Sequence, residues 1–207
     1  MQVQRPFAVV TPTLDGEILA VLARVDASLT VGQIRSLLPH RSDEGIRKAL
    51  RRLAAQGTVD SQPVGDVVGH RLNRSHLAAP QIIAIAHLRE TLIQRMRDSL
   101  EAWPTRPRWA ALFGSTARGE MEAESDIDIF LVAPEVDADL WEEWTRAFAA
   151  DVSAWTGNDA RILSLTEHEV RLSATTRDPI IESLLADAVA VLGPADWLRR
   201  AVRNARR

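Results

Sequence analysis

The chain has 207 residues, of which 46% are hydrophobic and 26% charged, and its formal net charge is −3. This length allows one large domain or two small domains with packed cores. Disulfides and thiolate metal sites are excluded, because the chain contains no cysteine. Residues 1–6 lack the apolar stretch of a signal peptide, and no run approaches the ~18 apolar residues of a membrane span, so we expect a cytoplasmic protein without a membrane partner.

The spacing of apolar residues predicts three helices near the start of the chain. The first follows Thr11-Pro12, a candidate cap with a first-turn proline. The second lies between Thr30, a candidate N-cap, and Pro39, which cannot continue a helix. The third lies between Ser42 and Gly57, a glycine of the kind that ends helices.

A β-hairpin is predicted after these helices, with strands at residues 58–61 and 67–72 around a turn at 63–66. Three helices followed by a hairpin is the order of a winged helix-turn-helix. On this arrangement, residues 13–74 resemble winged-helix transcription regulators. The resemblance implies a double-stranded DNA partner, with the third helix in the major groove and the hairpin wing on the phosphate backbone.

Basic side chains on the third helix and around it are the candidate DNA contacts. Residues 1–78 carry ten Arg and Lys against seven Asp and Glu, so this part of the chain is the basic one. A solvated helix face, or a winged helix used for protein contacts, would show the same pattern. The candidate DNA-binding residues are Arg41, Arg47, Lys48, Arg51, Arg52, His70 and Arg71.

A long helix is predicted from residue 79 to residue 101, with Pro80 in its first turn. Such a helix either pairs with its copy in a second chain, giving a homodimer, or packs within its own chain. We interpret residues 79–103 as a linker between a domain at 1–78 and a domain at 104–207. Its apolar stripe consists of Ile82, Ile85, Leu88, Leu92 and Met96.

Strands and helices are mixed in the last part of the chain. The expected fold class is therefore α+β: a winged helix-turn-helix, a linker helix and an α/β domain. The predicted strands lie at 109–113, from 126 onward, at 160–165 and at 188–193, and the predicted helices lie at 137–155, after Thr166 and at 178–186.

The most informative segment links the first two of these strands. Gly114 and Ser115 end a buried strand, and ten residues later Asp126 and Asp128 open the next one. Because side chains alternate along a strand, both aspartates point to one face. Paired carboxylates suit Mg²⁺, which keeps positions open for substrate phosphates. Gly114 lets the backbone approach a polyphosphate, the Ser115 hydroxyl donates to it, and Arg118 adds a forked cation.

This pattern resembles the DNA polymerase beta-like nucleotidyltransferase superfamily, specifically its minimal bacterial members. The resemblance implies that Gly114 and Ser115 bind the phosphates of a nucleoside triphosphate such as ATP. It also implies that Asp126 and Asp128 bind two Mg²⁺ ions while a nucleoside monophosphate passes to an acceptor hydroxyl with loss of pyrophosphate. A β-hairpin with a polar turn and two solvent-facing aspartates is the structural alternative.

The resemblance further implies a third carboxylate, on a neighbouring strand, that holds metal and accepts the proton of the attacking hydroxyl. Asp159, just before the strand at 160–165, is the candidate for this catalytic and metal-binding role. Arg161 is the competing residue. If the strand register places Arg161 at the site, a cation replaces the base and two-metal catalysis should fail.

Three functions remain open at this point. The protein is a DNA-binding nucleotidyltransferase that modifies a protein, a nucleic acid or a small molecule. Alternatively, it is a transcription regulator whose catalytically silent domain senses a nucleotide or dimerises. The third alternative is an antitoxin with a toxin partner, because minimal nucleotidyltransferases occur in toxin-antitoxin pairs.

Overall fold

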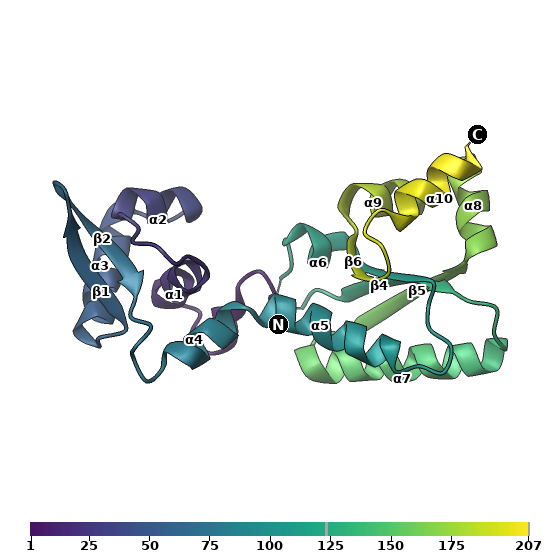
Figure 1. Ribbon diagram of the computed structural model, residues 1–207, viewed down its shortest axis with the longest axis horizontal. Helices are drawn as coiled ribbons and strands as arrows, with labels where there is room; N and C mark the ends of the chain where they lie inside the picture. Colours follow the sequence, from purple (N-terminus) through teal and green to yellow (C-terminus); the bar gives the residue numbers. More distant parts are fainter. Residues whose placement is uncertain (123, 207) are drawn as a thin grey trace. The chain divides into compact units, whose positions relative to one another are not determined.

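The computed structural model describes residues 1–122 and 124–206. The chain divides into two compact units. The first, which we call the N-terminal unit, contains Gln2 and residues 4–90, and the second, the C-terminal unit, contains Met1, Val3 and residues from Thr91 onward. The N-terminal unit consists of helices and a hairpin, and the C-terminal unit of helices on a sheet, so the mixed α+β class is confirmed (Figure 1). Within the described residues, no helix is long and apolar enough to cross a membrane.

The N-terminal unit contains three helices, α1 to α3, followed by a hairpin, in the order that the sequence predicts. The Thr30 hydroxyl accepts from the Gln33 amide, and the Ser42 hydroxyl accepts from the Gly45 amide, so both predicted N-caps are confirmed. The first helix begins after Thr13. The elements are η1 (Pro6–Val9), α1 (Leu14–Arg24), α2 (Val31–Leu37), α3 (Asp43–Ala55), β1 (Val59–Val64), β2 (Val67–Leu72) and α4 (Ala79–Ala86).

The single helix expected over residues 79–101 is instead two helices, α4 and α5 (Leu88–Glu101), separated by His87. The two halves of its apolar stripe pack into different cores. Ile82 of α4 is buried in the core of the N-terminal unit, whereas Leu92 and Met96 of α5 are buried in a core of the C-terminal unit. Tertiary packing of each half therefore outweighs the local preference for one continuous helix.

The C-terminal unit is built on a four-stranded sheet with the order β5-β4-β3-β6. Strand β3 is antiparallel to β4 and β6, whereas β4 and β5 are parallel. All four predicted strands are present, and a short helix, α6, which was not predicted from the sequence, follows β3 directly. The elements after α5 are β3 (Trp109–Leu112), α6 (Gly114–Arg118), β4 (Ile127–Ala133), α7 (Ala138–Thr156), β5 (Ala160–Thr166), α8 (Glu167–Thr176), α9 (Pro179–Asp187), β6 (Val189–Leu192) and α10 (Trp197–Ala205).

Both faces of this sheet are covered by helices, with α7 on one face and α8, α9 and α10 on the other (Figure 1). Along β4, Ile127 and Ile129 pack into the core shared with α5 and α7, whereas Phe130 packs into the core under α8 to α10. By alternation, Asp128 lies on the same face as Phe130. It stands at the start of the strand, where the helical cover of that face begins.

Candidate functional site

The turn from β3 into α6 lies directly against the start of β4. Gly114 adopts a left-handed conformation, with φ of 64°, and a Cβ atom there would lie 2.5 Å from Oδ2 of Asp128. The Phe113 amide donates to the Asp128 carbonyl at 3.1 Å, and the Thr116 hydroxyl donates to the Asp126 carbonyl at 3.3 Å. These contacts hold the first turn of α6, which includes Ser115, beside both aspartates. Only glycine fits at position 114.

Asp126 and Asp128 form a closely spaced pair of carboxylates at the beginning of β4. The pKa of Asp128 is raised, first by burial and then by the negative charge of Asp126, while Arg161 and Arg118 act in the opposite direction. Burial, and to a smaller extent the repulsion from Asp126, therefore disfavour the ionised form of Asp128. A bound cation would relieve this repulsion.

Arg161 occupies the position on β5 next to this pair. In the parallel register of β4 and β5, Arg161 is the partner of Asp128. Its Nη1 atom lies 2.8 Å from Oδ2 of Asp126, and its Nε atom lies 3.7 Å from Oδ2 of Asp159. A guanidinium therefore stands beside the two aspartates and links both strands.

Asp159 lies one residue before β5, and its carbonyl accepts from the Ile127 amide at 2.8 Å. Its side chain is 71% exposed and makes the longer contact, of 3.7 Å, to Arg161. Across residues 1–122 and 124–206, no group of three or more His, Asp or Glu side chains is placed to hold a metal ion. The arrangement is thus two carboxylates with a guanidinium.

Arg118 makes two ion pairs of its own. Its Nε atom donates to Glu120 at 2.7 Å and its Nη1 atom donates to Asp187 at 2.8 Å, and both hydrogen bonds raise its pKa. The second bond ties α6 to the end of α9. Arg118 therefore positions α6, and its charge acts on Asp128 from a distance. Nothing in the local sequence pattern identified Asp187 as its partner.

The two carboxylates fit one Mg²⁺ ion. Mg²⁺ in proteins is commonly held by one or two carboxylates, and substrate phosphates and water fill its other positions. Asp126 and Asp128 supply hard oxygen ligands, and a cation between them would offset the repulsion from Asp126 that contributes to the raised pKa of Asp128. Within residues 1–122 and 124–206, no third carboxylate joins them to complete a second metal position.

Each exposed cation on the outward face of α3 has a carboxylate near it. Arg47 lies 3.7 Å from Asp43, and Lys48 and Arg51 lie 3.9 and 3.5 Å from Glu44. The three basic side chains are at least half exposed. Pairs of this kind are weak in water, so the cations remain accessible to another anion.

The other DNA-binding candidates are Arg41, Arg52, Arg71 and His70, and the three arginines are ion-paired as well. Arg52 pairs with Asp15 at 2.7 Å, Arg71 lies 3.5 Å from Asp60, and Arg41 is bound to Glu17. His70, expected on the wing surface, is instead only 8% exposed, and its Nδ1 atom is hydrogen bonded to Ser61. Burial lowers its pKa, so the imidazole is neutral and unsuited to a phosphate contact. Alternation with the buried Leu72 was the sequence signal for this burial.

Residues 93–184 match the family model for "Nucleotidyltransferase domain". This part of the C-terminal unit is therefore a nucleotidyltransferase domain, and it contains the Gly114 turn and both aspartates. A solved structure described as "Crystal structure of the toxin-antitoxin with AMP-PNP" is similar over 56% of this chain and 82% of that chain, with 18% sequence identity and a TM-score of 0.39. The search of curated proteins found no match.

Proposed function

We propose that the C-terminal unit binds a nucleoside triphosphate, with ATP as the first candidate, together with one Mg²⁺ ion. The observation that carries this proposal is the contact between the Gly114 turn and Asp128, where a Cβ atom would come within 2.5 Å of a carboxylate oxygen. Asp126 and Asp128 would hold the metal. Gly114 and Ser115 stand beside them, where the backbone is open to the phosphates of a metal-bound nucleotide.

We further propose that this domain holds the nucleotide as a sensor rather than transferring it. Transfer requires a base that accepts the proton of the attacking hydroxyl. Arg161 occupies the position next to Asp128, and a guanidinium cannot accept a proton. Asp159 is the remaining candidate base, and its carboxylate faces the same guanidinium. A transferase would use Asp159 in this role.

An assay with ATP labelled at the α-phosphate distinguishes nucleotide sensing from nucleotidyl transfer. The purified chain is incubated with this ATP in the presence of cell extract. We expect the label to be retained on a filter with Mg²⁺ and lost with EDTA, and no acceptor to become covalently labelled. Label on a protein, a nucleic acid or a toxin partner would contradict the sensing role. Failure to retain label with Mg²⁺ would contradict nucleotide binding itself.

Replacing Arg161 by alanine should raise the affinity for divalent metal. The guanidinium competes with a metal ion for Asp126, and an exposed ion pair contributes up to about 1 kcal/mol, so we expect a gain of up to about fivefold. Titration with Mn²⁺ in the absence of nucleotide measures this gain in metal affinity. The control is Arg171→Ala, which breaks a comparable exposed pair with Glu167 on α8. It should leave the affinity for Mn²⁺ unchanged. Weaker Mn²⁺ binding in Arg161→Ala would show that the guanidinium is not a competitor.

We also propose that the N-terminal unit is a winged helix that binds duplex DNA through α3. Its three helices and hairpin, with at least half-exposed cations on α3, favour this second function. Joined to a nucleotide-binding domain, such a unit would serve as a ligand-responsive transcription regulator.

The double variant Arg47→Ala, Arg51→Ala should weaken duplex binding and flatten its salt dependence. Each phosphate contact contributes about 0.9 to the slope of log K against log salt, so the slope should fall by about two. Fluorescence anisotropy with a labelled duplex across a range of salt concentrations measures both effects. Arg146→Ala, Arg171→Ala, at two exposed arginines of the C-terminal unit, is the matched control. Equal binding by the wild type and the α3 variant would exclude this face of α3 as the DNA-binding surface.

A further inference from the structure

A cavity of about 420 Å³ opens in the N-terminal unit. It lies between the segment at residues 4–13, one face of α1 and the end of α2. This volume falls within the roughly 300–1,000 Å³ that is typical of small-molecule sites. Neither the nucleotide proposal nor the DNA proposal uses this cavity.

The size of two residues on α1 explains why the cavity exists. At Gly16 the segment touches α1, because a Cβ atom there would lie 2.8 Å from both Cβ of Phe7 and the carbonyl oxygen of Thr11. One turn further along α1 stands Ala20, which is too small to fill the space opposite it. Leu37 of α2 also lines the cavity and is 55% exposed. The lining therefore includes an apolar part, around Phe7, Ala20 and Leu37, that is open to solvent at Leu37.

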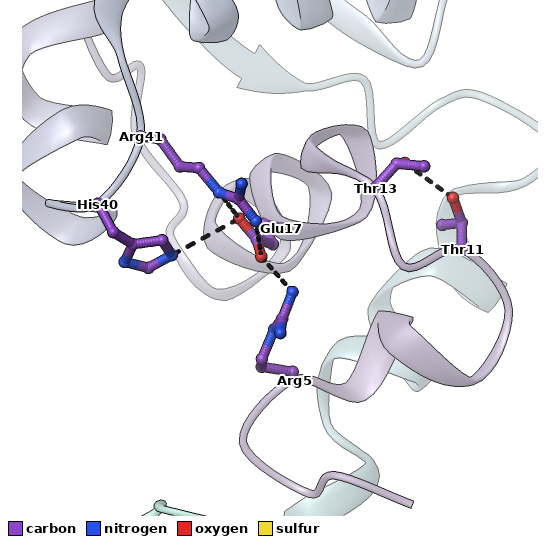
Figure 2. A network of polar contacts seen from close by, with 6 residues as sticks. All are labelled: Arg5, Thr11, Thr13, Glu17, His40 and Arg41. Carbon is purple, nitrogen blue, oxygen red and sulfur yellow. Dashed lines mark hydrogen bonds and ion pairs between the residues drawn. The ribbon is translucent and has the colours of Figure 1, made fainter. Parts of the chain in front are cut away.

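A cluster of charged side chains stands at this cavity (Figure 2). The Glu17 side chain is only 12% exposed. It accepts two hydrogen bonds from Arg41, both at 2.8 Å, and one from Arg5 at 2.6 Å, and His40 lies 3.9 Å away. The hydrogen bond from Arg41 is the main cause of the lowered pKa of Glu17, so this carboxylate is ionised at neutral pH.

The cluster carries an excess of positive charge. Two guanidiniums, of Arg5 and Arg41, surround the single carboxylate of Glu17. Arg5 and Glu17 line the cavity, and so does Arg24, whose guanidinium donates to the Ala86 carbonyl at 2.7 Å. A ligand cation would meet these arginines and a carboxylate that is already hydrogen bonded, whereas a ligand anion would be attracted.

We propose that this cavity is a binding site for a small amphipathic carboxylate, such as a medium-chain fatty acid. The apolar walls around Phe7, Ala20 and Leu37 take the hydrocarbon chain. Arg5, whose side chain is 43% exposed, offers the planar fork that pairs with a carboxylate. The site is separate from the nucleotide face, so this binding does not rest on the function proposed above.

Calorimetric titration of the full chain with decanoate, decanol and decylammonium, all below their aggregation concentrations, tests the proposal. The three probes share one hydrocarbon chain and differ in charge. We expect decanoate to bind at least about tenfold more tightly than either of the others, because a charge-assisted hydrogen bond is added to the same apolar burial. Equal binding of decanoate and decanol, or no binding of decanoate, would overturn the proposal.

Two variants and their matched controls locate the site. Ala20→Phe should abolish decanoate binding by filling the cavity, and Arg5→Gln should weaken it about tenfold while Arg41 keeps Glu17 paired. The controls are Ala150→Phe and Arg146→Gln, both at exposed positions of α7; both should bind decanoate like the wild type. Arg5→Gln alters an exposed side chain, so it remains informative if Ala20→Phe does not fold. Unchanged decanoate binding in Arg5→Gln would refute the assignment of this cavity as a carboxylate-binding site.

Discussion

Replacing Asp128 with asparagine should abolish Mg²⁺-dependent nucleotide binding. Asparagine keeps the shape of the side chain beside Gly114 but removes one of the two negative charges that would hold the metal. A charge pair about 4 Å apart near a protein surface is worth about 4 kcal/mol, so the affinity should fall by roughly a hundredfold or more. Calorimetry with ATP, in Mg²⁺ and in EDTA, measures the loss.

The same substitution should make the ligand-free C-terminal unit more stable at neutral pH. Because the pKa of Asp128 is raised, the folded state binds its proton more tightly than the unfolded state does. Stability therefore falls as the pH rises from the ordinary range of an aspartate through the raised pKa, and asparagine removes this decrease. All six tryptophans lie in the C-terminal unit, so tryptophan fluorescence during unfolding reports on this unit alone.

Glu124→Gln is the control for both measurements. Glu124 is an exposed carboxylate in the turn before β4, and its neutralisation changes the net charge by the same amount. We expect it to leave Mg²⁺-dependent ATP binding unchanged. If Asp128→Asn binds ATP as the wild type does, the nucleotide face lies elsewhere. If the two variants lose affinity equally, net charge rather than metal coordination explains the effect.

The second large effect is expected for Gly114→Ala. The left-handed backbone at this residue disfavours alanine by about 1–2 kcal/mol, and the clash with Asp128 adds about 1–3 kcal/mol of overpacking. The carboxylate or the turn must move, so ATP binding should be lost together with stability. Unfolding followed by tryptophan fluorescence and calorimetry with Mg²⁺-ATP measure the two consequences.

Gly157→Ala separates the backbone penalty from the effect of the clash with Asp128. Gly157 ends α7 with φ of 71°, close to that of Gly114, but a Cβ atom there would meet nothing within 4 Å. It should therefore show only the backbone penalty of about 1–2 kcal/mol and should bind ATP normally. Equal destabilisation by the two substitutions, with ATP binding intact in both, would show that the contact between Gly114 and Asp128 is unimportant.

Local features of the structure were accessible from the sequence. The capping residues Thr30, Ser42 and Thr166 precede helices as predicted, because a cap depends on side-chain and backbone groups within one turn. The spacing of Gly114 from the aspartates identified the nucleotidyltransferase domain because this motif is short and continuous in the chain.

Features that depend on distant segments were not accessible in this way. The break at His87 arises because the helices on its two sides bury their apolar residues in separate cores. The ion pair between Arg118 and Asp187 joins α6 to α9, and the cavity beside Glu17 is formed by three segments of the N-terminal unit. Neither the spacing of apolar residues nor a local motif predicts contacts between such distant segments.

The sequence by itself determined the three N-terminal helices, the hairpin, the four strands of the C-terminal sheet and the two aspartates at the start of β4, because these follow from periodicity and local hydrogen bonding. Only the tertiary structure decided which residue of β5 stands beside Asp128. A parallel pair has no tight turn to set its register, and shifting it by one residue moves every side chain to the other face. The observed register places Arg161 next to Asp128. The chemistry proposed for this domain depends on that placement.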